Sequence, residues 1–314
     1  MHYELALAIT PKVSGSLSII GSILIIRDVV KHWRSSSGHN YHQISATSRV
    51  LLSMSIADIG SSFFAHFLST WMVPPSDEIN IALAGGNETT CTIQAFTYEL
   101  FFYAAIWSYS LLAVAYWLTI CRQKNEDTLR NWKYQTLLIG IPWIIGLTSA
   151  IPKAILGQAS YNGYWWCELS EGRRVDNIPD QISVVICFIL VVFSLCSLIR
   201  FVYLREKKMD QFTFTSDQIV NREKTIQVTY QGLFYISVYL LIAAVSIPIT
   251  IDSLELSNGY VIFWSVLFPL QGFGNFLVYF RPKYVRIRQS SHNNSGTGRR
   301  GGRLASVLHT VCLY

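Results

Sequence analysis

The 314-residue chain is 51% hydrophobic and 14% charged, with a formal net charge of +6. Soluble domains carry about 25% charged residues, so this composition excludes an ordinary soluble domain and predicts a protein surrounded by lipid. The apolar residues are gathered into long runs, most of them near the roughly 20 residues that cross a bilayer core. Backbone groups in lipid must bond within their own segment, so each run is expected to be a helix.

Seven apolar runs follow one another along the chain. They cover residues 6–26, 50–73, 91–121, 134–151, 182–201, 228–251 and 260–280. The first is the weakest, because Lys12 lies near one end of it, where the ammonium group can reach the lipid headgroups. No Lys or Arg precedes Lys12, unlike in a cleaved signal peptide, so we expect this run to remain a span. The sequence therefore predicts an all-α fold, a seven-transmembrane helix bundle over residues 1–288, and a disordered cytoplasmic tail over 289–314.

The distribution of basic residues predicts the orientation of this bundle. The connections after odd-numbered spans, together with the C-terminal tail, hold 21 of the 25 Lys and Arg residues, and the other connections hold 4. Lys and Arg close to a membrane stay on the cytoplasmic side, so the N-terminus is predicted outside. The positive charge is thus explained by membrane topology and an acidic lipid surface, and it needs no nucleic-acid partner.

Two of the six cysteines fall on the predicted outer side. Cys91 opens the third run and Cys167 lies in the second outer loop, so both face an oxidising compartment. We expect them to form a disulfide that holds this loop across the mouth of the bundle, the alternative being two unpaired thiols. The cysteines inside or next to the runs, Cys121, Cys187 and Cys196, are expected to be small apolar residues.

A glycosylation acceptor sequence lies in the first outer loop. It reads Asn87-Glu88-Thr89 and is on the correct side of the membrane for modification. Short tripeptides of this kind also recur by chance, and this one lies close to the start of the third run. Whether Asn87 carries a glycan stays open.

Two carboxylates lie inside the apolar runs, where ionisable groups are costly and usually face the bundle interior. Asp58 lies in the second run among serines, whose hydroxyls can hydrogen-bond it. It is predicted either to hold a cation or change protonation as helices repack, or to tie helices together. Glu99 lies eight residues after Cys91, about 12 Å into the third helix.

The depth of Glu99 is that expected for a ligand pocket open to the outside. Aromatic residues surround it on the same helix and follow in the second outer loop. The candidate pocket comprises Tyr98, Glu99, Phe102, Tyr103, Trp165 and Trp166. The alternative for Glu99 is an acid that pairs with a neighbouring helix or reaches the headgroups.

The prolines in the middle of predicted spans are Pro142, Pro248 and Pro269. Each removes a backbone hydrogen bond and is expected to bend its helix. Bends in the sixth and seventh spans would favour movement there, although prolines are also simply common in membrane helices.

The end of the seventh run carries the most specific sequence pattern. It reads Pro269-Leu270-Gln271-Gly272, then Asn275, Tyr279 and Arg281-Pro282. With the seven spans, the two outer cysteines and Ser55-Ile56-Ala57-Asp58, this pattern resembles the cyclic-AMP-receptor-like branch of G-protein-coupled receptors. The resemblance covers residues 6–288. It implies a multi-pass plasma-membrane protein that senses an extracellular ligand and promotes nucleotide exchange on a heterotrimeric G protein.

The resemblance also implies roles for individual residues. Asp58 matches the buried acid of the second helix, and Asn275 and Tyr279 match a polar pair near the inner end of the seventh. Together the three form a candidate switch or ion site. Residues 281–289 match a short amphipathic helix on the inner membrane face.

One departure from the larger rhodopsin-like class concerns the inner end of the third helix. That class carries Asp-Arg-Tyr where this chain has Ala115-Tyr116-Trp117, and the nearest basic residue is Arg122. Either Tyr116 or Arg122 is then expected to take the place of the arginine, or activation works differently. Other candidate G-protein contacts lie in the basic third inner loop, although charge that sets topology explains them almost as well: Arg205, Lys207, Lys208 and Lys224.

Other seven-helix functions fit less well. A retinal protein needs a lysine in the seventh span, and residues 260–280 contain none. A zinc hydrolase needs several intramembrane ligands, but His66 is the only histidine in a span, so we expect neither an enzyme nor a metal or other cofactor. A transporter or channel that uses Asp58 and Glu99 as a cation path is the alternative function.

Overall fold

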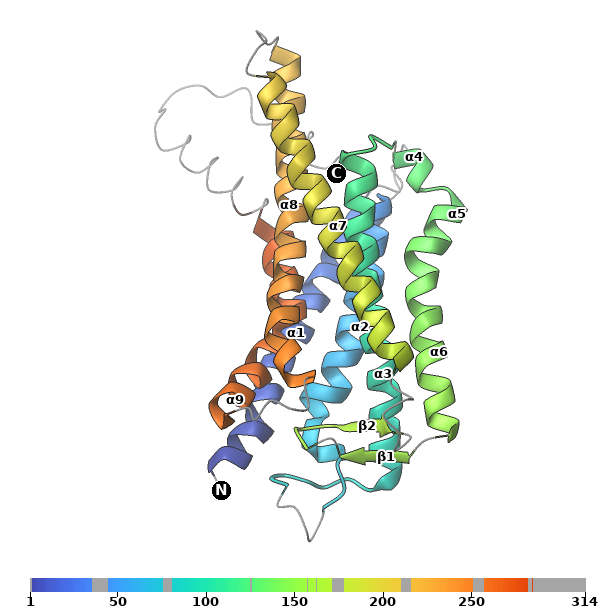
Figure 1. Cartoon of the computed structure of the whole chain (residues 1–314), viewed down its shortest axis with the longest axis vertical. Helices are drawn as coiled ribbons and strands as arrows, with labels where there is room; N and C mark the ends of the chain where they lie inside the picture. Colours follow the sequence, from blue (N-terminus) through green and yellow to red (C-terminus); the bar gives the residue numbers. More distant parts are fainter. Residues whose placement is uncertain are drawn as a thin grey trace.

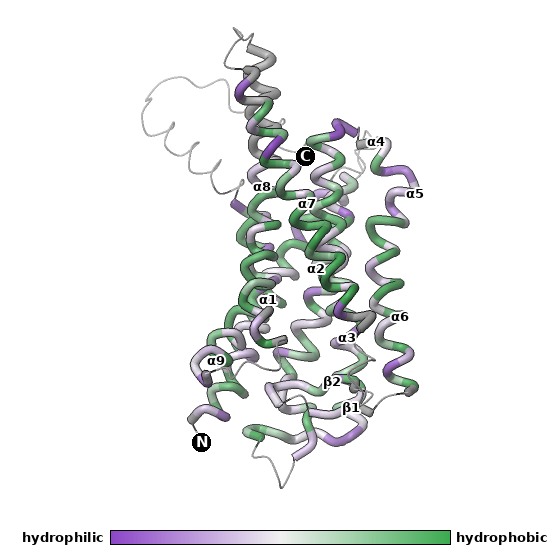
Figure 2. Tube along the Cα trace, viewed as in Figure 1, coloured by the Kyte–Doolittle hydropathy of each residue, from purple (hydrophilic) through white to green (hydrophobic). Residues whose placement is uncertain are grey.

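The computed structural model confirms an all-α bundle of seven helices that are long and apolar enough to cross a membrane, so the protein is a multi-pass membrane protein. It describes residues 2–35, 45–75, 81–124, 126–156, 158–161, 163–170, 178–209, 216–250, 257–281 and 284. The spans are Tyr3–Arg34, Ala46–Met72, Glu88–Ile120, Trp132–Ile155, Gln181–Leu204, Thr229–Ser246 and Asn258–Arg281. Figure 2 shows hydrophobic residues along the middle of these helices and hydrophilic ones toward their ends. The predicted tail lies outside the described residues, as does most of the predicted helix after the seventh span.

The elements follow the chain as shown in Figure 1. The first four spans consist of α1 (His2–Ser35), α2 (Ala46–Ser61) with η2 (Ser62–Leu68) and η3 (Ser69–Met72), α3 (Glu88–Ile120), and α5 (Trp132–Gln135) with η4 (Thr136–Gly140) and α6 (Ile141–Leu156). A short helix, α4 (Glu126–Leu129), precedes α5. The last three consist of α7 (Ile178–Met209), α8 (Ser216–Ser246) with η6 (Ile247–Thr250), and α9 (Asn258–Leu267) with η7 (Phe268–Leu270) and a helical stretch over 271–281.

Polar side chains fix where several of these helices begin. Ser45 accepts a hydrogen bond from the backbone N–H of Ser48 and so caps α2. Asn87 caps α3, where the Thr90 hydroxyl accepts a hydrogen bond from the Asn87 backbone N–H. Such caps satisfy N–H groups that have no partner within the helix. The helix α3 therefore starts three residues before the apolar run that predicted it.

The helix α3 lies at the centre of the bundle and packs against α2, α6 and α7. Small residues on its buried face, such as Ala104 and Ala113, let neighbouring helices approach closely. The buried core around it draws on α1, α2, α7 and α8 as well. A side chain on α3 can therefore contact several spans at once.

A two-stranded hairpin covers one end of the bundle. Strand β1 (Gln158–Tyr161) pairs antiparallel with β2 (Cys167–Ser170), so that Tyr161 lies opposite Cys167. Figure 1 shows this hairpin at the same end as the N-terminus, while α4 and α5 lie at the other. We call these the hairpin end and the basic end, which correspond to the predicted outer and inner sides.

The helices depart from α-helical geometry near each proline that was predicted to bend them. Pro248 lies in the 3-10 turn η6 and Pro269 in the 3-10 turn η7, while Pro142 follows the π-helical turn η4. One further break was not predicted. The second span becomes a π-helix at η2, and this π-helix ends before Ser69, whose φ of 48° is unusual for a non-glycine residue.

Candidate functional site

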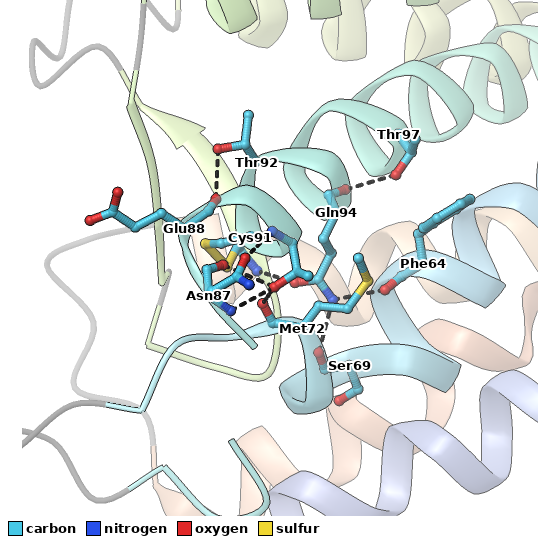
Figure 3. The surroundings of a disulfide bond; sticks show 11 residues. Phe64, Ser69, Met72, Asn87, Glu88, Cys91, Thr92, Gln94 and Thr97 are labelled. Atoms are coloured by element: carbon cyan, nitrogen blue, oxygen red, sulfur yellow. Dashed lines mark hydrogen bonds between the residues drawn. A yellow bond between two sulfur atoms is a disulfide. The ribbon is translucent and has the colours of Figure 1, made fainter. Parts of the chain in front are cut away.

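Cys91 and Cys167 form the predicted disulfide, with Cα atoms 5.4 Å apart. It joins the start of α3 to β2, and both cysteines are buried. Figure 3 shows the bond beside the capped N-terminus of α3. The hairpin is therefore fastened to the central helix of the bundle.

Gln94 reinforces this attachment, and the sequence reasoning missed it. Its Nε2 donates to the carbonyl oxygens of Phe64 and Ser69 at 2.8 and 2.9 Å, and its Oε1 accepts from the Cys167 backbone N–H at 2.8 Å. The bonds to the second span are visible in Figure 3. Gln94 is fully buried and lies one turn after Cys91. A long polar residue so close to a disulfide cysteine was the signal that could have revealed it.

Aromatic side chains from the hairpin connection fill the mouth of the bundle. Trp165 donates from Nε1 to Nδ1 of His66 at 3.1 Å, and its backbone oxygen accepts from the Ser69 hydroxyl. Trp165 and Trp264 have ring centres 4.8 Å apart. We call the whole group the aromatic cluster: His66, Tyr98, Phe102, Tyr164, Trp165, Trp166, Trp264 and Phe268.

The hairpin itself contributes a neutral polar contact next to this cluster. The Tyr161 hydroxyl donates to the Tyr164 carbonyl oxygen at 2.8 Å. Burial, with a smaller contribution from the negative charge of Glu4, raises the pKa of Tyr161 to about 12. The hydroxyl therefore stays protonated at neutral pH and keeps this bond.

The predicted pocket residues separate into two groups. Tyr98, Phe102, Trp165 and Trp166 lie together in the aromatic cluster, and the Tyr103 ring contacts Phe102. The Glu99 carboxylate turns instead toward α6.

There Glu99 accepts a hydrogen bond from Ser149 at 3.0 Å and forms an ion pair with Lys153. Lys153 follows the predicted fourth span, which ends at residue 151, and the structure places it within α6. The structure thus shows Glu99 as an acid paired with a neighbouring helix.

A buried polar group joins three spans at the middle of the bundle. The Asp58 carboxylate accepts hydrogen bonds from Nδ2 of Asn275 at 2.9 Å and from the Tyr109 hydroxyl at 3.2 Å. The side chains of Asn275 and Tyr109 also bond each other. We call these three residues the polar node. A small cavity with room for about one water molecule extends from Asp58 to His66 and Phe268 of the aromatic cluster.

Tyr279 does not join the polar node. Its hydroxyl donates to the Asp28 carboxylate of α1 at 2.6 Å. The first helix extends well past the predicted span and so brings Asp28 to this position. The candidate switch site therefore divides into the polar node and a separate contact between the first and seventh spans.

Stacked tyrosines lie between α3 and α8 toward the basic end. Tyr109 stacks on Tyr239 with ring centres 5.6 Å apart, and Tyr116 stacks on Tyr235 at 6.3 Å. We call these four residues the tyrosine ladder. Arg122 lies beyond the end of α3, where its guanidinium is exposed and rests 5.2 Å from the Trp117 ring. Tyr116, and not Arg122, thus occupies the interface between the third and sixth spans.

The remaining candidate residues, for G-protein contact and for glycosylation, lie at the surface or have side chains outside the described set. Lys207 is exposed near the end of α7. Asn87 is exposed, and its Oδ1 accepts from the Thr90 backbone N–H, whereas a glycan would attach to Nδ2. The other three residues predicted for the third inner loop have side chains outside the described set: Arg205, Lys208 and Lys224.

Comparison with known proteins gives no family. The chain matches no protein-family model and no curated protein sequence. Over the part of the chain that the structure describes, no group of three His, Cys, Asp or Glu side chains could hold a metal ion. A functional conclusion must therefore rest on the geometry of the bundle.

Proposed function

We propose that the protein is a cell-surface G-protein-coupled receptor that binds an extracellular ligand at its hairpin end and activates a heterotrimeric G protein at its basic end. Disulfides persist in oxidising compartments, so the Cys91–Cys167 bond supports an outer position for the hairpin end. The distribution of Lys and Arg supports the same orientation. The plasma membrane is the location that this function requires.

The observation that carries the proposal is a series of contacts from the hairpin to the basic end, joined at one step by a small cavity. Trp165 of the hairpin connection bonds to His66, and the His66 ring packs 5.4 Å from that of Phe268. Both rings line the small cavity that reaches Asp58. Asp58 bonds to Tyr109, which also begins the tyrosine ladder. A ligand that displaces the hairpin tryptophans would therefore disturb packed groups along the whole bundle.

The contacts of α8 suit the movement that a receptor needs. Near the basic end α8 meets α3 through flat ring faces, and Pro248 breaks the regular helix at the opposite end. Contacts between ring faces depend less on direction than hydrogen bonds do, so they tolerate sliding. Outward movement of α8 would open a cavity at the basic end, where a G protein could bind.

G-protein dissociation in cells, measured by resonance energy transfer against a panel of Gα subtypes, tests the proposal. Cells expressing the chain should show dissociation of at least one subtype, either without added ligand or with one member of a ligand panel. Asp58→Ala should change this signal at equal surface expression. Ile189→Ala, on the lipid-facing side of α7, is the matched control and should leave it unchanged.

A well-expressed protein that gives no dissociation with any subtype or ligand would contradict the receptor proposal. The transporter alternative draws on the cavity beside Asp58 and His66. Proton or sodium flux into liposomes that contain the purified protein, abolished by Asp58→Asn, would favour that alternative.

A further inference from the structure

Lys12 lies inside the first span and faces the break in the second span. Its Nζ donates to the backbone oxygen of Leu68 at 3.0 Å and lies 4.1 Å from the centre of the Trp71 ring. Leu68 is the last residue of the π-helix η2, and the positive φ of Ser69 ends the helix there. The hydrogen bond to Leu68 and the contact with Trp71 hold the ammonium group at a defined place between α1 and the second span.

Two observations place this ammonium group at the level of the lipid headgroups. Trp71 is one residue from the end of the span Ala46–Met72, and tryptophans favour the membrane interface. Along α1, Lys12 and Lys31 are 19 residues apart, which is about 28 Å of helix at ~1.5 Å per residue. That length matches the roughly 30 Å of a bilayer core. Both ends of α1 thus carry a lysine near a headgroup layer.

The Lys12 ammonium group has N–H donors left to bind an anionic partner. An ammonium group has three N–H donors, and the Leu68 oxygen accepts one of them. The three ion pairs found among the described residues join other side chains. A half-buried cation at the edge of a membrane is stabilised by a counter-charge, and the phosphates of the headgroup layer lie at this level.

An aromatic stripe leads from Lys12 toward the middle of the membrane. Trp71, Phe67 and Phe63 are spaced four residues apart on one face of the second span. The Phe67 ring lies 6.0 Å from Trp71 and 5.7 Å from Phe63. Trp71 and Phe63 are exposed to the surroundings, which in a membrane means exposed to lipid. Val13, next to Lys12 on α1, is exposed as well.

We propose that Lys12 and this stripe form a binding site for one phospholipid of the leaflet at the hairpin end. A phosphate oxygen accepts a hydrogen bond from Lys12 Nζ, and an acyl chain lies along Trp71, Phe67 and Phe63. The bound lipid would brace α1 against the broken end of the second span. That end also carries His66 and Ser69, which contact the hairpin.

Native mass spectrometry of the protein purified in maltoside tests the site. The probes are dioleoylphosphatidylglycerol, dioleoylphosphatidylcholine and a phosphate-free monogalactosyl lipid with the same acyl chains. The wild-type protein should retain one molecule of either phospholipid at least about tenfold better than the galactolipid, since charge-assisted hydrogen bonds contribute about 1.5–3 kcal/mol. Lys12→Gln should lose this preference, and Lys12→Arg should keep it. Lys31→Gln, at the other end of α1, is the matched control and should behave as wild type.

Equal retention of the three lipids by the wild-type protein, or an unchanged preference in Lys12→Gln, would overturn the proposal and leave adventitious lipid only. Thermal unfolding of the wild-type protein in nanodiscs gives a second measurement that needs no variant. The midpoint should be higher in phosphatidylglycerol or phosphatidylcholine than in the galactolipid. Identical midpoints would also count against the site. Neither measurement depends on G-protein coupling.

Discussion

The hairpin and α8 are attached to α3 by different kinds of contact. In the hairpin half, a disulfide and the three hydrogen bonds of Gln94 join the hairpin, the second span and α3. In the basic half, α8 meets α3 through the stacked rings of Tyr116 and Tyr235 and meets the seventh span through Arg281 over Phe234. Hydrogen bonds lose their energy when their atoms move by an ångström, whereas stacked faces tolerate sliding. The difference suggests a fixed frame at the hairpin end and a movable contact at the basic end.

The helix α8 shows the contrast within a single element. At its hairpin end, Tyr260 donates to the Val245 backbone oxygen at 2.7 Å, and Trp264 donates to the Ser246 hydroxyl at 3.2 Å. Toward its basic end, α8 contacts α3 through the stacked rings of the tyrosine ladder. A rotation of α8 about its hairpin end would therefore keep its directional bonds and change mainly ring contacts. The polar node lies between the two halves.

Removal of the disulfide is the largest perturbation of the fixed half. The Cys91–Cys167 bond closes a loop of 76 residues, so Cys91→Ser should lower the free energy of unfolding by roughly 2–5 kcal/mol. Thermal unfolding in detergent, with and without reductant, measures the change. Cys196→Ser, at an exposed free cysteine of α7, is the control and should unfold like the wild type. If Cys91→Ser were equally stable, the hairpin would not be part of a fixed frame.

Replacement of Gln94 tests the same half without breaking a covalent bond. Gln94→Leu would keep a similar volume but leave the Phe64 and Ser69 oxygens and the Cys167 N–H without this partner. Buried groups left unpaired cost about 1–3 kcal/mol each, partly relieved by relaxation, so we expect a loss of about 3 kcal/mol. The midpoint of thermal unfolding should fall, while Thr92→Ala, at an exposed position two residues earlier on α3, should shift it little. A loss no larger than the control's would mean that the hairpin is held by the disulfide alone.

The spans could be predicted from the sequence because a segment that crosses a lipid bilayer has few possible backbone structures. Long apolar runs must form helices in a membrane, and this rule needs no knowledge of packing. The π-helix η2 and the break at Ser69 escaped prediction, because neither proline nor glycine marks them. They are stabilised by Lys12 and Gln94 from two other helices. Such tertiary contacts cannot be read from local sequence.

The sequence predicted those site residues that have an unusual chemical character in a membrane span. It missed those whose role depends on which side chains the fold brings together. Asp58 stood out as a carboxylate in an apolar run, but its partner Tyr109 looked like one aromatic among many. For Glu99, pairing with a neighbouring helix was one of two alternatives, but its partner Lys153 was not identified because it follows the predicted end of the fourth span. Tyr279 was grouped with Asp58, and the structure pairs it with Asp28, which lies beyond the predicted end of the first span.

The polar node tests whether the two halves are coupled. Asp58→Ala removes the acceptor of Asn275 and Tyr109 and should cost about 2 kcal/mol, whereas Asp58→Asn keeps an amide oxygen in place and should cost less than about 1 kcal/mol. Thermal unfolding separates the two variants. If the node transmits movement, basal G-protein dissociation should change even in Asp58→Asn, at equal surface expression. Unchanged signalling in that variant, with the expected loss of stability in Asp58→Ala, would make the node a structural tie only.

The smallest expected change in stability concerns the tyrosine ladder. A Cβ added at Gly232 of α8 would lie 3.2 Å from Cγ of Tyr116, so Gly232→Ala should displace the Tyr116 ring slightly. Alanine favours a helix over glycine by up to about 1 kcal/mol, and the displaced ring offsets most of this gain. The net change in unfolding free energy should be below about 1 kcal/mol, while basal G-protein dissociation should rise. Gly140→Ala is the control, because its Cβ would meet Thr136 at an ordinary 3.6 Å. If Gly232→Ala lowered stability as much as Gln94→Leu does, the basic half would be as rigid as the hairpin half, and the contrast between them would fail.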